Sequence, residues 1–167
     1  DLPTPTAGRR PRALMRRLLP EPGPVDPVTA YADLPEVEGR PSLRLNMVAS
    51  IDGAIAVDGT SGALGGDADR RVFMALRSLA DAVLVAAGTV RAESYGPPRL
   101  PGELIGQRLA RGQSALPRIA VVTRSLDLDW RSALFSDATP DARPLVITCT
   151  DAPAEVRDRA ADFAEVL

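Results

Sequence analysis

Three short apolar runs divide the chain after residue 80, and each one is bounded by polar residues. They cover residues 82–87, 119–122 and 144–147. Uninterrupted apolar runs of this length are typical of strands that are covered on both faces of a parallel sheet. The sequence therefore predicts three buried strands in this half of the chain.

Helical patterns lie between and after these runs. In residues 67–80 the apolar side chains of Val72, Leu76 and Leu79 recur at i, i+4 and i+7, with Asp67 as a candidate N-cap. A second helix is predicted for residues 151–166, whereas residues 99–117 resemble an irregular connection with about one helical turn. Strands that alternate with helices predict an α/β domain with a mostly parallel central sheet and flanking helices.

A fourth strand is predicted for residues 42–50, and an unusual segment follows it. The strand runs into Asp52, and five glycines then lie between residues 53 and 66. Glycine has no Cβ, so the backbone there can pass close to a ligand. Asp52 followed by Gly53 is equally typical of a turn.

Each predicted strand ends in a polar loop, at residues 50–53, 88–94, 123–127 and 148–153. Turns are polar in most proteins, so a single loop of this kind indicates little. In open α/β sheets, however, ligands bind beyond the carboxyl ends of the strands. The four loops together favour a ligand site at that edge.

The composition limits the kinds of catalytic and metal site that the chain can contain. The chain has no histidine, and all 20 of its basic residues are arginine. This excludes histidine-containing triads, His/Cys zinc sites, Schiff-base lysines and a P-loop lysine within the chain, so we expect no metal and a cofactor that carries the reaction. The net charge of −2 and the lack of a long apolar run indicate neither a nucleic-acid nor a membrane partner.

The chain is predicted to have an arm and one domain. Residues 1–42 contain 9 of the 16 prolines and are interpreted as an extended Pro/Arg-rich arm; residues 43–167 form the α/β domain. A cluster of five arginines between residues 9 and 17 fits either an anionic partner or a solvated segment. The single cysteine, Cys149, fits a small buried residue and a reducing compartment, and we expect a cytoplasmic protein.

Two sequence segments resemble a known family. "LRLNMVASIDGAIA", followed by a Gly/Ser-rich loop, and "ALRSLADAVLVAAGTVRAE" are similar to the reductase domain of riboflavin biosynthesis, the RibD C-terminal domain, over roughly residues 43–167. The resemblance implies a dihydrofolate reductase-like fold. It also implies NADPH-dependent reduction of a phosphoribosylamino-pyrimidine, a small-molecule substrate. We further expect a homodimer.

The resemblance implies a cofactor site. One group of residues would approach the pyrophosphate, at the start of a helix after a glycine: Gly88, Thr89 and Val90. A second group would hold the adenosine 2′-phosphate: Thr123, Arg124 and Ser125. Two residues would flank the nicotinamide: Ala49 and Ala56.

The resemblance also implies a substrate site. Ser61 and Arg77 match positions that hold the ribose phosphate; Asn46 is a further substrate residue. Glu93 matches a family carboxylate, and Asp52 lies in the facing loop, so both are candidate catalytic residues. From the residues alone, Asn46 could equally have the structural role of holding the end of a strand. Arg77 could equally be a cation that interacts favourably with the dipole at a helix C-terminus.

The chain departs from the family pattern on the substrate side. Ala54 replaces a basic residue, "AESYGPPRL" replaces A-D-[DN]-P-x-L, and the family's later strands and G-G cofactor loop are expected beyond residue 167. Two alternatives therefore stay open. One is a reductase of dihydrofolate or another pterin, and the other is a non-catalytic nucleotide-binding module on the same scaffold.

Overall fold

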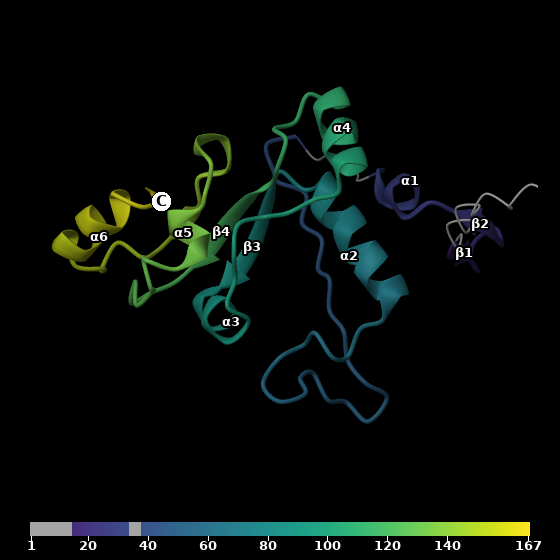
Figure 1. Cartoon of the computed structure of the whole chain (residues 1–167), viewed down its shortest axis with the longest axis horizontal. Coiled ribbons are helices and arrows are strands. Elements are labelled where there is room, and N and C mark those ends of the chain that lie inside the picture. The colour runs from purple at the N-terminus through teal and green to yellow at the C-terminus, as the bar shows by residue number, and fades with distance from the viewer. Residues whose placement is uncertain (1–14, 34–37) are drawn as a thin grey trace, which may run out of the picture.

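A four-stranded parallel sheet forms the centre of the protein (Figure 1). The computed structural model describes residues 15–33 and 38–167. The strands lie in the order β3 (Ala82–Ala86), β4 (Arg118–Val122), β5 (Leu145–Ile147) and β6 (Glu165–Val166). The three strands predicted after residue 80 are thus confirmed, as is their parallel arrangement.

Helices connect the strands. α3 (Ala87–Ala92) and α4 (Gly102–Ala110) follow β3, α5 (Ala133–Ser136) and the 3₁₀ turn η1 (Pro140–Ala142) follow β4, and α6 (Ala154–Ala161) follows β5. The interpretation of residues 99–117 as irregular was wrong. Leu104 and Arg108, one turn apart, are both buried, so that stretch has an inward helix face that includes an arginine.

The second predicted helix is too long at its C-terminal end. α6 ends at Ala161, and the chain then forms β6 beside β5, with Leu167 N–H donating to the Val146 carbonyl at 2.9 Å. The inward face of α6 is as predicted, because Ala160 is fully buried and Val156 packs against the core. Pairing with β5 satisfies backbone groups that a longer helix would have satisfied internally.

The hydrophobic core lies mainly on one face of the sheet. Ile119, Val121, Leu134 and Val146 are each 0% exposed. The central residues of β4 are buried on both faces, as predicted, but Val122 at its end is 43% exposed, and Leu84 of β3 is 55% exposed. The apolar run at β3 predicted burial on both faces, but the described residues cover only one face of this strand.

The helix predicted for residues 67–80 is confirmed as α2 (Asp67–Leu79). Its N-cap is Gly66 and not Asp67; Asp67 and Asp69 lie in the first turn, where their charges favour the helix N-terminus. Its most deeply buried residues are Ala75 and Ser78, between the predicted apolar positions.

A buried arginine from α4 caps the C-terminal end of α2. Arg108 is fully buried; its Nη1 donates to the carbonyls of Ser78 at 3.1 Å and Ala80 at 2.6 Å, and its Nε to the Ser114 carbonyl at 2.8 Å. The Arg111 Nη2 adds a 2.7 Å bond to Ser78. These donors satisfy helix-end carbonyls that have no partner within the helix. Burial lowers the pKa of Arg108 below its usual value.

The strand predicted for residues 42–50 does not form. Its alternating apolar side chains, Leu43, Leu45 and Met47, are 73–81% exposed. Within the described ranges, no strand pairs with this segment. A strand needs a neighbour for its N–H and C=O groups, so the period-2 pattern alone cannot produce one. Arg44 instead fastens the segment to α1 by donating to the Tyr31 carbonyl at 2.8 Å.

Part of the N-terminal arm is folded, contrary to the prediction. β1 (Met15–Arg17) and β2 (Gly23–Val25) form an antiparallel pair, which lies at the opposite end of the molecule from α6 (Figure 1). α1 (Pro27–Tyr31) follows and packs against α2. Three of the five arginines between residues 9 and 17, namely Arg9, Arg10 and Arg12, lie outside the described residues.

Candidate functional site

Two of the predicted cofactor segments lie side by side at the carboxyl edge of the sheet. Ala86 at the end of β3 pairs with Val122 at the end of β4, so residues 88–90 and 123–125 leave the sheet at the same edge. Arg91 of α3 donates from Nη1 to the Asp127 carbonyl at 2.8 Å. This bond links α3 to the loop after β4 just beyond the two segments.

The residues of these two segments differ in how far they are exposed to a ligand. Gly88 and Thr89 are exposed in the first turn of α3, whereas Val90 is buried in the core. α3 begins at Ala87, so the helix does not follow the glycine as expected but contains it. A Cβ on Gly88 would meet no atom within 4 Å, so the space above its backbone is open.

The loop after β4 presents Arg124 and Ser125 to solvent. Thr123, in contrast, is 6% exposed, and its Oγ1 accepts a bond from the Leu126 N–H at 3.1 Å. Its hydroxyl therefore shapes the loop. No residue in the described part of the chain pairs with the Arg124 guanidinium.

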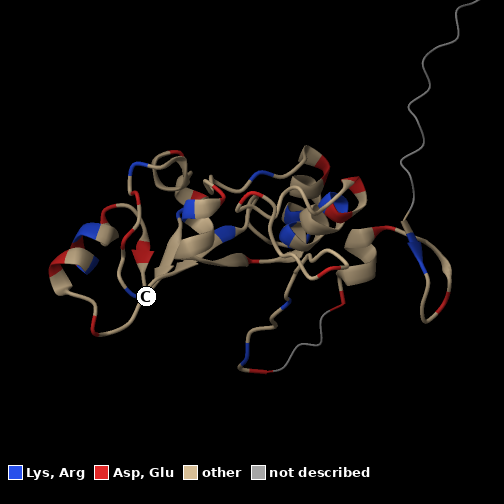
Figure 2. Ribbon diagram, turned by 90° about the horizontal axis from the view of Figure 1, so that it is seen from below, with Lys and Arg blue, Asp and Glu red and all other residues tan. Residues whose placement is uncertain are grey.

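A cavity of about 580 Å³ adjoins this loop. It lies between the loop after β4 and α6, and Trp130, Glu155 and Arg159 line it together with residues 125–128 and Val156. Its lining combines an aromatic ring, charges of both signs and exposed Ser125. The cavity thus extends the carboxyl-edge site towards α6, whose surface carries both acidic and basic residues (Figure 2).

Glu93 and Ser61 are in direct contact, although 32 residues separate them. Glu93 Oε1 accepts from the Ser61 backbone N–H at 2.8 Å and from the Ser61 hydroxyl at 3.0 Å. The structure therefore brings together one predicted catalytic residue and one predicted phosphate residue.

Arg77 is held between two aromatic rings that were not predicted to belong to the site. Its guanidinium carbon lies 4.3 Å from the Phe73 ring centroid and 5.2 Å from that of Tyr95, and its Nη2 donates to the Tyr95 hydroxyl. Its buried Nε has no partner. Phe73 stands four residues before Arg77 on one helix face, so this pair was detectable from spacing.

The remaining predicted residues lie in the irregular segment 43–57. Asn46, Ala49, Asp52 and Ala56 are all exposed there, and within the described residues none of them forms a hydrogen bond to the carboxyl edge of the sheet. The turn predicted at Asp52–Gly53 is confirmed, with Gly53 N–H donating to the Ser50 carbonyl at 2.9 Å and a φ of +88° at Gly53.

The carboxyl group of Asp52 is fully exposed. The Ser50 hydroxyl donates to it, and this bond, together with the backbone N–H groups of the turn, lowers the pKa of Asp52 below its usual value. Asp52 is therefore ionised at neutral pH, where it acts as a hydrogen-bond acceptor and not as a proton donor.

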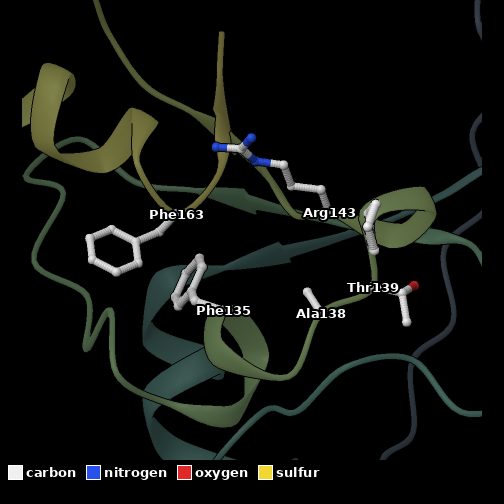
Figure 3. Close-up of a pocket in the computed structure, with 6 residues that line it drawn as sticks. Phe135, Ala138, Thr139, Arg143 and Phe163 are labelled. Atoms are coloured by element: carbon white, nitrogen blue, oxygen red, sulfur yellow. The ribbon is translucent and has the colours of Figure 1, made fainter.

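A second cavity, of about 360 Å³, lies at the opposite edge of the sheet. Phe135, Thr139, Arg143 and Phe163 line it, and Figure 3 shows their side chains around it. Arg143 precedes β5 and Phe163 precedes β6, so this cavity adjoins the amino ends of those strands. It is separate from the carboxyl-edge site.

Residues 15–33 and 38–167 contain no cluster of three or more His, Cys, Asp or Glu side chains that could hold a metal ion. No helix in these ranges has the length and apolar character needed to cross a membrane.

Comparison with known proteins identifies the family. The sequence profile of the RibD C-terminal domain matches residues 41–167. The chain belongs to this family. Among solved structures, a pyrimidine reductase-like protein from Corynebacterium diphtheriae is 34% identical and superposes with a TM-score of 0.63 over 72% of this chain. No curated protein matches the chain.

The RibD C-terminal domain assignment confirms the predicted family and its dihydrofolate reductase-like α/β fold. The aligned region covers 52% of the C. diphtheriae protein, so this chain spans about half the length of that relative. Within this RibD-type fold, the best-formed part of the site is the carboxyl edge of β3 and β4.

Proposed function

We propose that the protein is an NADPH-dependent reductase whose substrate is a phosphoribosylamino-pyrimidine. The observation that carries the proposal is the register of β3 and β4, which places exposed Gly88 and Thr89 beside exposed Arg124 and Ser125. Open backbone next to a guanidinium suits a ligand that has both a pyrophosphate and a further phosphate. Membership in the RibD C-terminal domain family supports the same reading.

The proposed cofactor lies along this edge. Arg124 and Ser125 bind the adenosine 2′-phosphate, and the cavity lined by Trp130 is large enough for groups next to it. The backbone at Gly88 and Thr89 approaches the pyrophosphate. Ala49 and Ala56 flank the nicotinamide, and bound NADPH supplies the hydride.

The proposed substrate lies against the glycine-rich loop. Arg77 supplies the positive charge for the substrate phosphate, near Ser61 of the loop. Asp52, which is ionised, accepts N–H bonds from the pyrimidine, and Asn46 binds the same substrate. The protein's own role is mainly to bind and orient the reactants, and because the chain has no histidine or lysine, any proton transfer would use an Asp, Glu, Tyr or Cys side chain.

One observation favours a pterin as the second candidate substrate. The Arg77 guanidinium is already engaged by the Tyr95 hydroxyl and by two rings, which reduces what it offers a phosphate. A pterin has no phosphate and needs a carboxylate that accepts two parallel N–H bonds. Asp52 or Glu93 would serve this purpose.

Replacement of Arg77 by alanine distinguishes these substrates. If Arg77 binds a phosphate, Arg77→Ala in the full-length protein should lower kcat/KM for the ribosylamino-pyrimidine phosphate about tenfold, the lower end for a hydrogen bond to a charged group. Turnover of dihydrofolate should not depend on Arg77. Arg70→Ala, an exposed arginine on the same helix, is the matched control.

The opposite pattern would contradict the pyrimidine reading. If Arg77→Ala leaves every turnover unchanged while Glu93→Gln abolishes pterin reduction, the pterin is the substrate. If neither change affects any substrate, the nucleotide-binding module becomes the better account. Thermal unfolding of each variant separates a lost contact from lost packing against Phe73.

We also propose a homodimer. Leu45 and Met47 in the irregular segment and Leu84 on the open face of β3 are exposed apolar residues, and surfaces of this kind favour association. Sedimentation of the 167-residue chain should give about twice its mass of 17.6 kDa. Leu84→Glu should shift the protein towards the monomer, and a monomer at all concentrations without this change would contradict the proposal.

A further inference from the structure

Glu93 connects the glycine-rich loop to the core of the domain. We infer that Glu93 is a positioning residue that does not itself act on the substrate. Its carboxylate holds residues 57–66 in place through two hydrogen bonds from Ser61, a contact that we call the clasp. The effect on kinetics rests on the proposed function. The clasp itself exists in the protein without ligands and does not depend on that proposal.

The contact between Glu93 and Ser61 consists of two hydrogen bonds to one carboxylate oxygen. Both donors of Ser61, the backbone N–H and the hydroxyl, converge on the single oxygen Oε1, at 2.8 and 3.0 Å. Hydrogen bonds to an ionised carboxylate are among the stronger ones in proteins. Two of them at one residue fix both the position and the orientation of the loop backbone there.

The loop needs an external anchor, because its own hydrogen bonds are local. Val57 and Thr60 exchange backbone bonds of 2.8 and 3.0 Å, and Leu64 N–H donates to the Ser61 carbonyl at 3.0 Å. Asp58 and Gly59 have positive φ angles of 50° and 82°, which form the tight turn before Ser61. These bonds shape the loop but do not hold it against the rest of the domain.

Glu93 is a rigid anchor. It caps the C-terminal end of α3, where its N–H donates to the Thr89 carbonyl at 2.9 Å. The same helix places Val90 in the core, and Tyr95 N–H returns to the Val90 carbonyl at 3.1 Å. The position of Glu93 is therefore set by buried packing.

The segment from Glu93 to Tyr95 holds both proposed phosphate residues. Glu93 binds Ser61, and Tyr95, two residues later, contacts the Arg77 guanidinium with its hydroxyl and ring. This three-residue segment thus sets the position of the loop relative to α2. Loss of the clasp would leave Arg77 in place and release only Ser61 and its loop.

Hydrogen exchange in the protein without ligand tests the clasp directly. Glu93→Ala should speed exchange of the Ser61 amide about tenfold, as expected when a hydrogen bond to a charged group is lost. Glu93→Gln keeps an acceptor oxygen and should retain most of the protection. Asp158→Ala, which removes an exposed carboxylate on α6, should change nothing in the loop. Unchanged exchange in Glu93→Ala would overturn the clasp.

Kinetics with the ribosylamino-pyrimidine phosphate test its role. A positioning function predicts that Glu93→Ala raises KM more than it lowers kcat. Glu93→Gln should keep KM and kcat close to those of the wild type. Ser61→Ala keeps one of the two bonds, so its KM should lie between those of the wild type and Glu93→Ala. A Gln variant with normal loop protection but a kcat as low as that of Glu93→Ala would overturn the inference and make Glu93 a catalytic residue. If the wild-type protein reduces no substrate, the proposed function fails, while hydrogen exchange still decides the clasp.

Discussion

Replacing Arg124 with alanine is expected to weaken NADPH binding by about 10- to 150-fold and to leave NADH binding nearly unchanged. The exposed guanidinium follows β4 directly and is free to bind a 2′-phosphate, which NADH lacks. Loss of a hydrogen bond between charged groups costs about 1.5–3 kcal/mol, which corresponds to this range of affinity. Calorimetric titration of the full-length protein with each cofactor measures both values.

The control for this experiment is Arg131→Ala, which removes an exposed arginine from the same connection. It should leave both affinities unchanged. An equal loss for NADPH and NADH in Arg124→Ala would move the 2′-phosphate site away from the loop after β4. An unchanged NADPH affinity would remove Arg124 from the cofactor site altogether.

Replacing Arg108 with methionine is expected to destabilise the fold by about 3 kcal/mol or more. Methionine fills a similar volume but leaves the carbonyls of Ala80 and Ser114 without the donors that Arg108 supplies, while the Ser78 carbonyl keeps only its bond from Arg111. Each buried acceptor left unpaired costs about 1–3 kcal/mol, and the relief of desolvating the buried guanidinium offsets only part of this. Urea unfolding followed by circular dichroism measures the loss.

Arg99→Met is the matched control, because it makes the same change at an exposed arginine in the connection before α4. Its free energy of unfolding should stay within about 0.5 kcal/mol of the wild type. A similar small change for Arg108→Met would mean that water or neighbouring donors such as Arg111 replace the lost bonds. The cap on α2 would then carry little of the stability.

The parts of the fold that local pattern decides were predictable. β4 has an apolar run whose central residues are buried on both faces, and α2 has apolar residues at helical spacing; each formed where expected. α4 was missed because its inward face contains Arg108, which sequence rules assign to the surface. A buried arginine is recognisable only once the carbonyls that surround it are known.

Tertiary partners explain the other differences. Residues 42–50 have a strand pattern, yet pattern cannot supply the neighbouring strand that pairing requires. For the candidate site, the resemblance named Ser61, Arg77 and Glu93 but not the contacts that these residues make. The contact of Ser61 with Glu93 joins residues 32 positions apart, and Tyr95 reaches Arg77 across 18, so neither follows from local spacing.

The measurement that tests the central claim most directly is oxidation of NADPH by the full-length protein in the presence of single candidate substrates. The panel contains a phosphoribosylamino-pyrimidine, its dephosphorylated form and dihydrofolate. We expect rapid oxidation with the phosphorylated pyrimidine, slower oxidation without the phosphate, and a preference for NADPH over NADH. Saturable binding of NADPH with no oxidation in any mixture would contradict the account and favour the nucleotide-binding module.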